Sequence, residues 1–122
     1  LMVDKPFIQP IQDLLIQDHC KNNMILTGDA STVLQPVTVS GAFKGISDAM
    51  DLYEIFKSDH SIDESLHQWN SNKAEKANDL VTLGKRLSDF YVLSPPNWAA
   101  ISPEEINVLW EEIVHDTNWY MR

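Results

Sequence analysis

From residue 40 to the end of the chain, apolar residues recur at the three- and four-residue spacing of amphipathic helices. One predicted helix follows Ser40, and its apolar stripe comprises Ala42, Ile46, Ala49, Met50, Tyr53 and Phe56. The next stripe predicts a helix longer than about seven turns, with Leu66, Trp69, Ala77, Leu80, Gly84, Leu87 and Tyr91 on one side. The last comprises Ile106, Leu109, Trp110, Ile113 and Val114.

Capping signals fix the ends of these helices. Ser61 and Glu64 form a capping box, in which the serine hydroxyl accepts from the glutamate amide and the carboxylate reaches back. Ser102 and Glu105 repeat the pattern, with Pro103 in the first turn. The sequence Ser94-Pro95-Pro96-Asn97 ends the long helix.

The amino-terminal third is less regular. Pro6 and Pro10 break residues 1–10, which we expect to be an extended arm. A turn at Lys21-Asn22-Asn23 precedes Met24–Thr27, which we interpret as a short buried strand ending at Gly28. The predicted fold class is therefore mostly α: one or two short amino-terminal strands, then three helices that pack as an antiparallel bundle around tryptophans and leucines.

Composition limits the possible functions. The chain has 122 residues, enough for one small domain, and a net charge of −9 from 18 acidic and 9 basic residues. This balance argues against nucleic acid or an anionic membrane as a partner, because both attract clustered Lys and Arg. No apolar run approaches the length of a membrane span. Cys20, the single cysteine, excludes an internal disulfide and is consistent with a cytoplasmic protein.

Several residues that suggest chemistry have simpler interpretations. The histidines lack metal-ligand spacing, and we expect all of them at the surface or in loops: His19, His60, His67 and His115. Cys20 has no assignable base, so it is a poor nucleophile candidate. Carboxylates over residues 59–64 fit a loop and a helix start rather than a calcium loop. We expect the tryptophans to be packing residues: Trp69, Trp98, Trp110 and Trp119.

The informative segment is residues 26–49, LTGDASTVLQPVTVSGAFKGISDA. A strand followed by Gly28 lets the backbone turn sharply and approach a ligand, and the Asp29 carboxylate can accept hydrogen bonds from sugar or polyol hydroxyls. Amides at the helix start after Gly41 are unpaired and carry the positive end of the helix dipole, which suits an electron-rich group.

This segment resembles the second FAD-binding motif of the flavoprotein aromatic hydroxylases. The matching positions are Gly28, Asp29, Ala30, Pro36, Gly41, Asp48 and Ala49. Phe7-Ile8-Gln9, Asp13, Thr38 and Lys44 are similar to the branch with salicylate and dihydroxypyridine hydroxylases. The resemblance extends over roughly residues 6–93 and is tight only over residues 26–49.

The resemblance implies a role for each of these positions. Asp29 would hydrogen-bond the ribityl chain of FAD, and Pro36 would lie beside the reactive edge of the isoalloxazine. The amides around Gly41 and Ala42 would face the pyrimidine end of the ring, and Lys44 would contribute to the cofactor site. The two later helices would match the family's closing helices, which pack over the FAD domain and often form dimer contacts.

The chain also departs from the family pattern. Thr32 replaces a usual His or Phe, Val39 replaces the first glycine of the turn, and Phe43 replaces a frequent Asn. There is no GxGxxG motif, so the element that holds the FAD diphosphate is absent from this sequence. Simpler interpretations stay open: Asp29 as a turn cap, Lys44 as a solvated side chain, and Thr38 and Ser40 as turn and cap residues.

We therefore expect a carboxy-terminal FAD-binding segment of a larger monooxygenase that uses NAD(P)H and O2 to hydroxylate an aromatic or heteroaromatic substrate. Residues 1–49 would form the arm, strand and FAD motif, and residues 50–122 the helical region. The chain starts at Leu1 rather than Met and is interpreted as an excised piece, inactive alone. It would self-associate or bind the missing amino-terminal part. The alternative is a non-catalytic helical interaction or dimerisation module, or a truncated remnant of that family.

Overall fold

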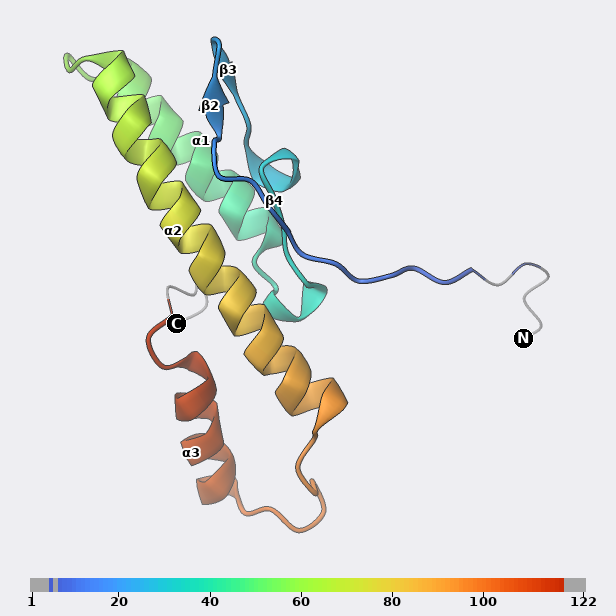
Figure 1. Ribbon diagram of the computed structural model, residues 1–122. Helices are drawn as coiled ribbons and strands as arrows, with labels where there is room; N and C mark the ends of the chain where they lie inside the picture. Colours follow the sequence, from blue (N-terminus) through green and yellow to red (C-terminus); the bar gives the residue numbers. More distant parts are fainter. Residues whose placement is uncertain (1–4, 6, 118–122) are drawn as a thin grey trace.

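The computed structural model describes residue 5 and residues 7–117, and within them the fold is mostly α, as predicted (Figure 1). Three α-helices follow an amino-terminal region of short strands and turns: α1 (Gly41–Lys57), α2 (Ile62–Ser88) and α3 (Pro103–Val114). A π-helical turn, η3 (Asp89–Leu93), extends α2. Trp119 and most of residues 1–6 lie outside the described residues, so the predictions for them have no structural counterpart.

The predicted number of strands was too low, because the described residues contain two antiparallel pairs. β2 (Cys20–Lys21) pairs with β3 (Met24–Ile25) through a turn in which Asn22 and Asn23 both have positive φ. β1 (Leu14–Leu15) pairs with β4 (Thr32–Val33). The strand at Met24 therefore finds its partner within the chain. The prediction that this strand is buried was wrong, since the Met24 side chain is largely exposed.

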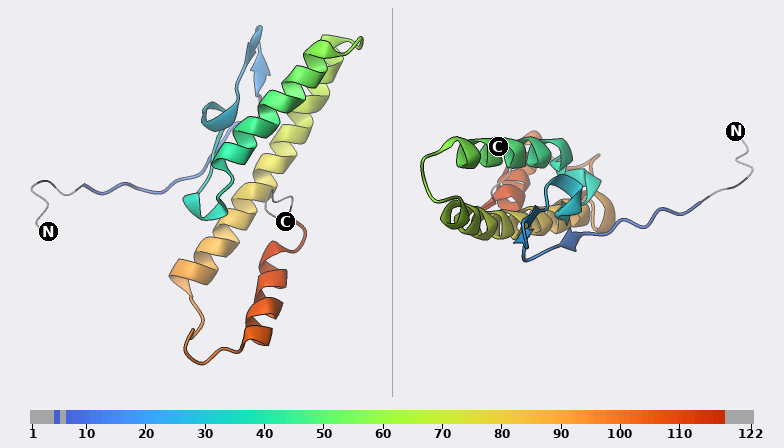
Figure 2. Two further views of the ribbon diagram at one scale, coloured as in Figure 1. Left: turned by 180° about the vertical axis from the view of Figure 1, so that it is seen from behind. Right: turned by 90° about the horizontal axis from the view of Figure 1, so that it is seen from above.

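The single three-helix bundle predicted from the sequence was also wrong. Figures 1 and 2 show α1 antiparallel to the first half of α2, and α3 antiparallel to its second half. α2 thus belongs to two helix pairs, one at each end. Leu83 and Leu87 of α2 pack with Val114 of α3, and half-buried Trp110 lies against them. In the first half of α2, which pairs with α1, Trp69 is buried.

Helix ends follow the predicted signals. At Ser61 only half of the predicted capping box is present: its hydroxyl accepts a hydrogen bond from the Glu64 amide at 3.4 Å, without the return bond from the carboxylate. At α3 the complete capping box is present, with Ser102 and Glu105 each accepting a bond from the other's backbone amide. The helical backbone after α2 stops at Leu93, and Ser94 separates it from the two prolines. Tyr91, predicted on the buried stripe, is instead exposed and stacks on Trp98 at 6.1 Å.

The apolar stripe of α1 is not its buried face. Its apolar stripe faces solvent, with Ile46, Met50 and Tyr53 each more than half exposed. The buried face instead carries Lys44 and Asp48, which are 4% and 5% exposed. These charges are buried because each has an opposite charge beside it, in the amino-terminal turn or on α2. Periodicity identified the helix, but it did not distinguish the two faces.

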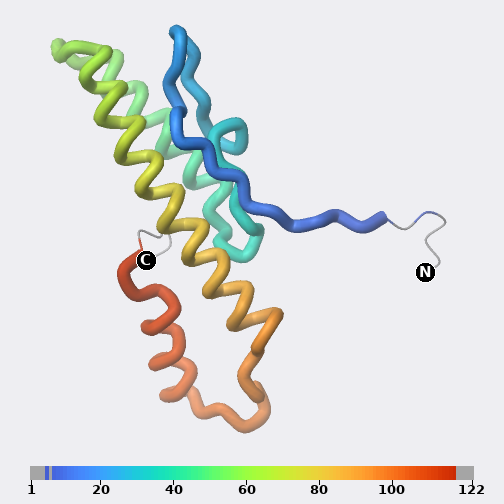
Figure 3. The backbone as a smooth tube through the Cα atoms, in the orientation of Figure 1, coloured from blue at the N-terminus to red at the C-terminus, as the bar shows by residue number. Residues whose placement is uncertain are grey.

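Two further features concern the apolar segments of the chain. No helix among the described residues is long and apolar enough to cross a membrane. The amino-terminal arm leads away from the helices (Figure 3), and its apolar side chains Phe7 and Ile8 are almost fully exposed.

Candidate functional site

The turn at Gly28 is held by α1. Gly28 begins a short 3-10 helix, η1 (Gly28–Ala30), with a φ of 55° that favours glycine. Its amide donates to Oδ2 of Asp48 at 2.8 Å, and its carbonyl accepts from the Ser31 hydroxyl at 2.8 Å. Gly28 and Asp48 are 20 residues apart in the sequence, so this bond fixes the turn of the motif onto α1.

Asp48 also joins α1 to α2. Its Oδ1 forms an ion pair with Nζ of Lys73, and both side chains are 7% exposed. Burial lowers the pKa of Lys73, although the adjacent Asp48 opposes this shift. A buried ion pair has a large desolvation cost, but removal of one partner leaves the other charge uncompensated. Asp48 therefore links the Gly28 turn, α1 and α2.

Asp29 presents its carboxylate to solvent. The side chain is 81% exposed and Oδ1 lies 3.0 Å from Nζ of Lys44, whose side chain is 5% exposed. The Lys44 ammonium also donates to the Thr32 carbonyl. Lys44 is thus not a solvated side chain, and the Asp29 carboxylate is bound by this lysine rather than capping its turn. The pair places a carboxylate with vacant acceptor positions next to a fixed cation.

The other predicted site residues surround the start of α1. Pro36 is the first residue of a second 3-10 helix, η2 (Pro36–Thr38), and Gly41 is the first residue of α1. Pro36, Gly41 and Ala42 are exposed. Ser40 occupies the cap position, but its hydroxyl donates to the Thr38 carbonyl at 3.0 Å instead of capping the helix. Thr38 donates to the Gln35 carbonyl at 3.1 Å, as expected of a turn residue.

Gln35 links the arm, the motif and α2. Its amide and side-chain nitrogen donate to the two oxygens of Asp13 at 3.0 and 2.9 Å, and its side-chain oxygen accepts from Ser88. The loop also packs closely on α2 at Gly84, because a Cβ added to Gly84 would lie only 3.2 Å from Cγ2 of Thr38. The loop that leads into α1 is therefore held from two sides.

Val39 departs from the family pattern at a position with an unusual backbone. It has a φ of 53° and a ψ of 19°, in the left-handed region. A β-branched residue is strained in this conformation, which glycine adopts without cost. The structure thus gives a physical reason why a glycine would be suited to this position, and it indicates that valine leaves the turn under strain.

His19 was predicted at the surface or in a loop, and it lies in the bend before β2 but is only 1% exposed. Its amide donates to the Asn70 side chain at 2.6 Å, and its ring meets Trp69 edge to face at 6.4 Å between centroids. Among the described residues, neither ring nitrogen has a hydrogen-bond partner. Burial lowers the pKa of His19, and the nearby Lys73 acts in the same direction. Burial also raises the pKa of the neighbouring Cys20 thiol, which argues against a reactive thiolate.

Sequence reasoning missed Lys73, although a signal was present. The predicted stripe of α2 skips from Trp69 to Ala77, and Lys73 lies at the missing helical position between them. A charge within an apolar stripe indicates a buried partner, and Asp48 in the motif was the available carboxylate.

A groove of about 720 Å³ lies between α1 and α2. Lys44, Asp48 and Lys73 form part of its lining, together with exposed acidic residues such as Asp51 and Glu64. Asp29, Pro36 and Gly41 are not among its lining residues. The groove therefore shares Lys44 and Asp48 with the motif segment but is not lined by the residues expected to contact flavin.

Comparison with known proteins gave one informative match. Over 88 residues the chain is 24% identical to a 2,6-dihydroxypyridine 3-monooxygenase from Paenarthrobacter nicotinovorans. The aligned region covers 72% of this chain and 22% of that protein. No family model matches, and no solved structure matches. The match supports a distant relationship to a monooxygenase, in agreement with the coarser part of the resemblance described above.

Proposed function

We propose that this chain is the carboxy-terminal FAD-binding segment of a flavin-dependent monooxygenase that hydroxylates an aromatic or heteroaromatic ring with NAD(P)H and O2. The observation that carries the proposal is the motif turn at Gly28 and Asp29, fixed on α1 with its carboxylate in solvent. The distant similarity to a dihydroxypyridine monooxygenase supports the same class of reaction.

The residues present fit part of an FAD molecule. Asp29 offers an acceptor to the ribityl hydroxyls, and space around Gly28 and Gly41 is open, because an added Cβ at either would meet nothing within 4 Å. Helix α1 starts with the exposed residues Gly41 and Ala42, where the helix dipole favours an electron-rich group. Lys44 holds Asp29 in place and adds positive charge beneath it.

These contacts suggest separate roles for the cofactor and for the residues of this chain. Bound FAD would supply the redox and oxygen chemistry, which belongs to the cofactor. The residues of this chain would orient it: Asp29 by hydrogen bonding, Pro36 by packing, and the start of α1 by its dipole. The GxGxxG element is absent from the sequence, so the diphosphate would be held by another part of the parent enzyme. Isolated, the chain is expected to bind weakly and to be inactive.

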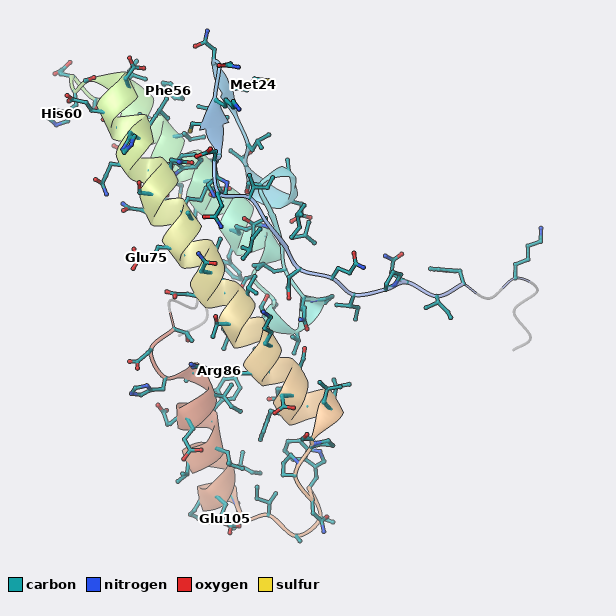
Figure 4. All side chains as sticks on the ribbon, viewed as in Figure 1. Met24, Phe56, His60, Glu75, Arg86 and Glu105 are labelled. Atoms are coloured by element: carbon teal, nitrogen blue, oxygen red, sulfur yellow. The ribbon has the colours of Figure 1, made fainter. Side chains whose placement is uncertain are left out.

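The test is a fluorescence titration of FAD with the purified chain. We expect saturable binding that weakens about tenfold in Asp29→Asn, since a hydrogen bond to a charged group contributes about 1.5 kcal/mol or more. Glu75→Gln is the matched control, because it removes the same charge from an exposed position on α2 (Figure 4). Equal weakening in both variants, or a folded chain with no saturable signal, would oppose the proposal.

A second function has its own support. The exposed apolar face of α1 and the absence of GxGxxG from the sequence favour a non-catalytic helical interaction module or a truncated remnant. The encoding reading frame upstream of Leu1 separates the two. A strand followed by GxGxxG in that frame supports the enzyme, whereas a stop codon supports the module.

A further inference from the structure

The β2–β3 hairpin is held on the helices through one buried side chain. The hairpin lies against the first half of α2 (Figure 1). Between residues 16 and 27, all of which the structure describes, only His19 is buried, at 1% exposed. Cys20 and Ile25 are half-buried, and Met24, beside the turn of the hairpin, is 64% exposed (Figure 4). Loss of the His19 contact would therefore leave the hairpin with little buried surface on α2.

His19 contacts its surroundings through its ring, its amide and its carbonyl. The ring meets Trp69 of α2 edge to face, with 6.4 Å between the ring centres. The amide donates to the side-chain oxygen of Asn70, also on α2, at 2.6 Å. The carbonyl accepts from the Leu26 amide at 2.8 Å, which closes the base of the hairpin. Since Leu26 comes two residues before Gly28, the same contacts hold the strand that leads into the motif turn.

The surroundings of the ring suit neutral imidazole better than imidazolium. Both ring nitrogens are buried, and neither has a hydrogen-bond partner among the described residues. Protonation would add a charge and a second N–H donor in this position, which is costly without an acceptor. Burial is thus the main cause that lowers the pKa of His19, and the Lys73 ammonium of α2 acts in the same direction. Asp48 of α1 and the adjacent Asp18 oppose this shift without cancelling it.

We infer that His19 is a proton-sensitive switch, which docks the β2–β3 hairpin on α2 when the ring is neutral and releases the hairpin when the ring is protonated. The released imidazolium is hydrated, so both of its N–H groups find acceptors. Helices α1 and α2 stay paired after release, because the ion pair between Asp48 and Lys73 joins them without the His19 ring. Release therefore changes the order of residues 16–27 alone. This behaviour belongs to the chain without FAD and is independent of the proposed function.

The direction of the pH dependence follows from the two states of the ring. In the released hairpin the pKa of His19 is near its ordinary value of 6.5, whereas in the docked hairpin it lies below that value. Docking is therefore complete above pH 6.5 and is lost as the pH falls from 6.5 through the docked pKa. Because one proton is taken up, the ratio of docked to released hairpin should fall by up to about tenfold between about pH 7.5 and about pH 5.5.

The experiment is amide hydrogen exchange of the ¹⁵N-labelled full chain at these two pH values, with each rate divided into the intrinsic rate to give a protection factor. The amides of His19 and Leu26 report docking, and the amide of buried Leu83 reports α2. Protection at His19 and Leu26 should fall by up to about tenfold at the lower pH and should stay below that of Leu83 at both, since release requires less free energy than unfolding of α2. Equal protection at all three amides would mean that the hairpin leaves α2 only when the whole chain unfolds, and would overturn the proposal.

Three variants assign the effect to the His19 ring. His19→Phe keeps an aromatic ring beside Trp69 but takes up no proton, so the pH dependence of protection at Leu26 should be lost. His67→Gln removes an exposed histidine of α2 and is the matched control, which should keep the dependence. Asn70→Ala removes the acceptor of the His19 amide and should lower protection at Leu26 by the same factor, on the order of fivefold, at both pH values. A native chain whose protection at Leu26 does not change with pH, or a His19→Phe variant that keeps the full change, would overturn the proposal.

Discussion

Replacement of Val39 by glycine is expected to stabilise the protein. Val39 is held at a φ of 53° between η2 and α1, a conformation that costs an L-residue with a side chain about 1–2 kcal/mol, with β-branched residues at the upper end. Glycine removes this strain. It also adds conformational entropy to the unfolded chain and gives up the partial burial of the valine side chain, so the net gain is expected to be about 0.5–1 kcal/mol.

A matched control substitution separates the free-energy cost of the left-handed backbone from the other effects of a valine-to-glycine change. Val108 in α3 is 60% exposed, almost the same as Val39 at 61%, but has ordinary helical backbone. Valine-to-glycine at the two positions loses a similar amount of packing and gains similar unfolded-state entropy. The difference between the two changes in unfolding free energy therefore reports mainly the left-handed strain, and we expect about 2 kcal/mol in favour of the Val39→Gly variant.

Urea denaturation followed by circular dichroism measures both variants. The midpoint should rise for Val39→Gly and fall for Val108→Gly, with unchanged slopes. If both substitutions destabilise equally, the turn before α1 is not strained, and the account of why a glycine suits this position is wrong.

Two further predictions concern the buried charges. Asp48→Asn keeps an acceptor for the Gly28 amide but leaves Lys73 without its counter-charge, so unfolding free energy should fall by about 3–5 kcal/mol, whereas Asp48→Leu with Lys73→Met removes both charges and should cost less; equal losses in urea denaturation would contradict the ion-pair account. Burial lowers the pKa of His19 below its ordinary value of 6.5, so the unfolded chain binds the extra proton first as the pH falls. Stability should therefore be full above pH 6.5 and decline as pH falls from there through the folded pKa. His19→Phe should remove this part of the pH dependence, and an unchanged profile in that variant would refute it.

The helices were predictable because their signals are local. The serine caps and the proline pair depend on residues a few positions apart, and the structure has helix ends at Ser61, Leu93 and Ser102 as expected. The length of α2 followed from one helical period of apolar residues, with a single gap at Lys73. Such features need no knowledge of what packs against the helix.

The packing was less predictable because it depends on distant pairs. The apolar stripe of α1 was predicted, but the burial of Lys44 and Asp48 on another face was not, because their partners are 15 and 25 residues away in sequence. His19 looked like a loop residue because nothing in the sequence places it beside Trp69. The ion pair between Asp29 and Lys44 and the bond from Gly28 to Asp48 both required the folded chain.

The central claim is that the surface formed by Asp29 and the start of α1 is half of a flavin site. The most direct test is to add FAD to the ¹⁵N-labelled chain and follow its amide resonances. The account predicts saturable shifts confined to the Gly28–Asp29 turn and the first turn of α1, at Gly41 and Ala42, and their loss in Asp29→Asn. Shifts centred instead on the groove between α1 and α2, or an unperturbed spectrum of a folded chain, would contradict it.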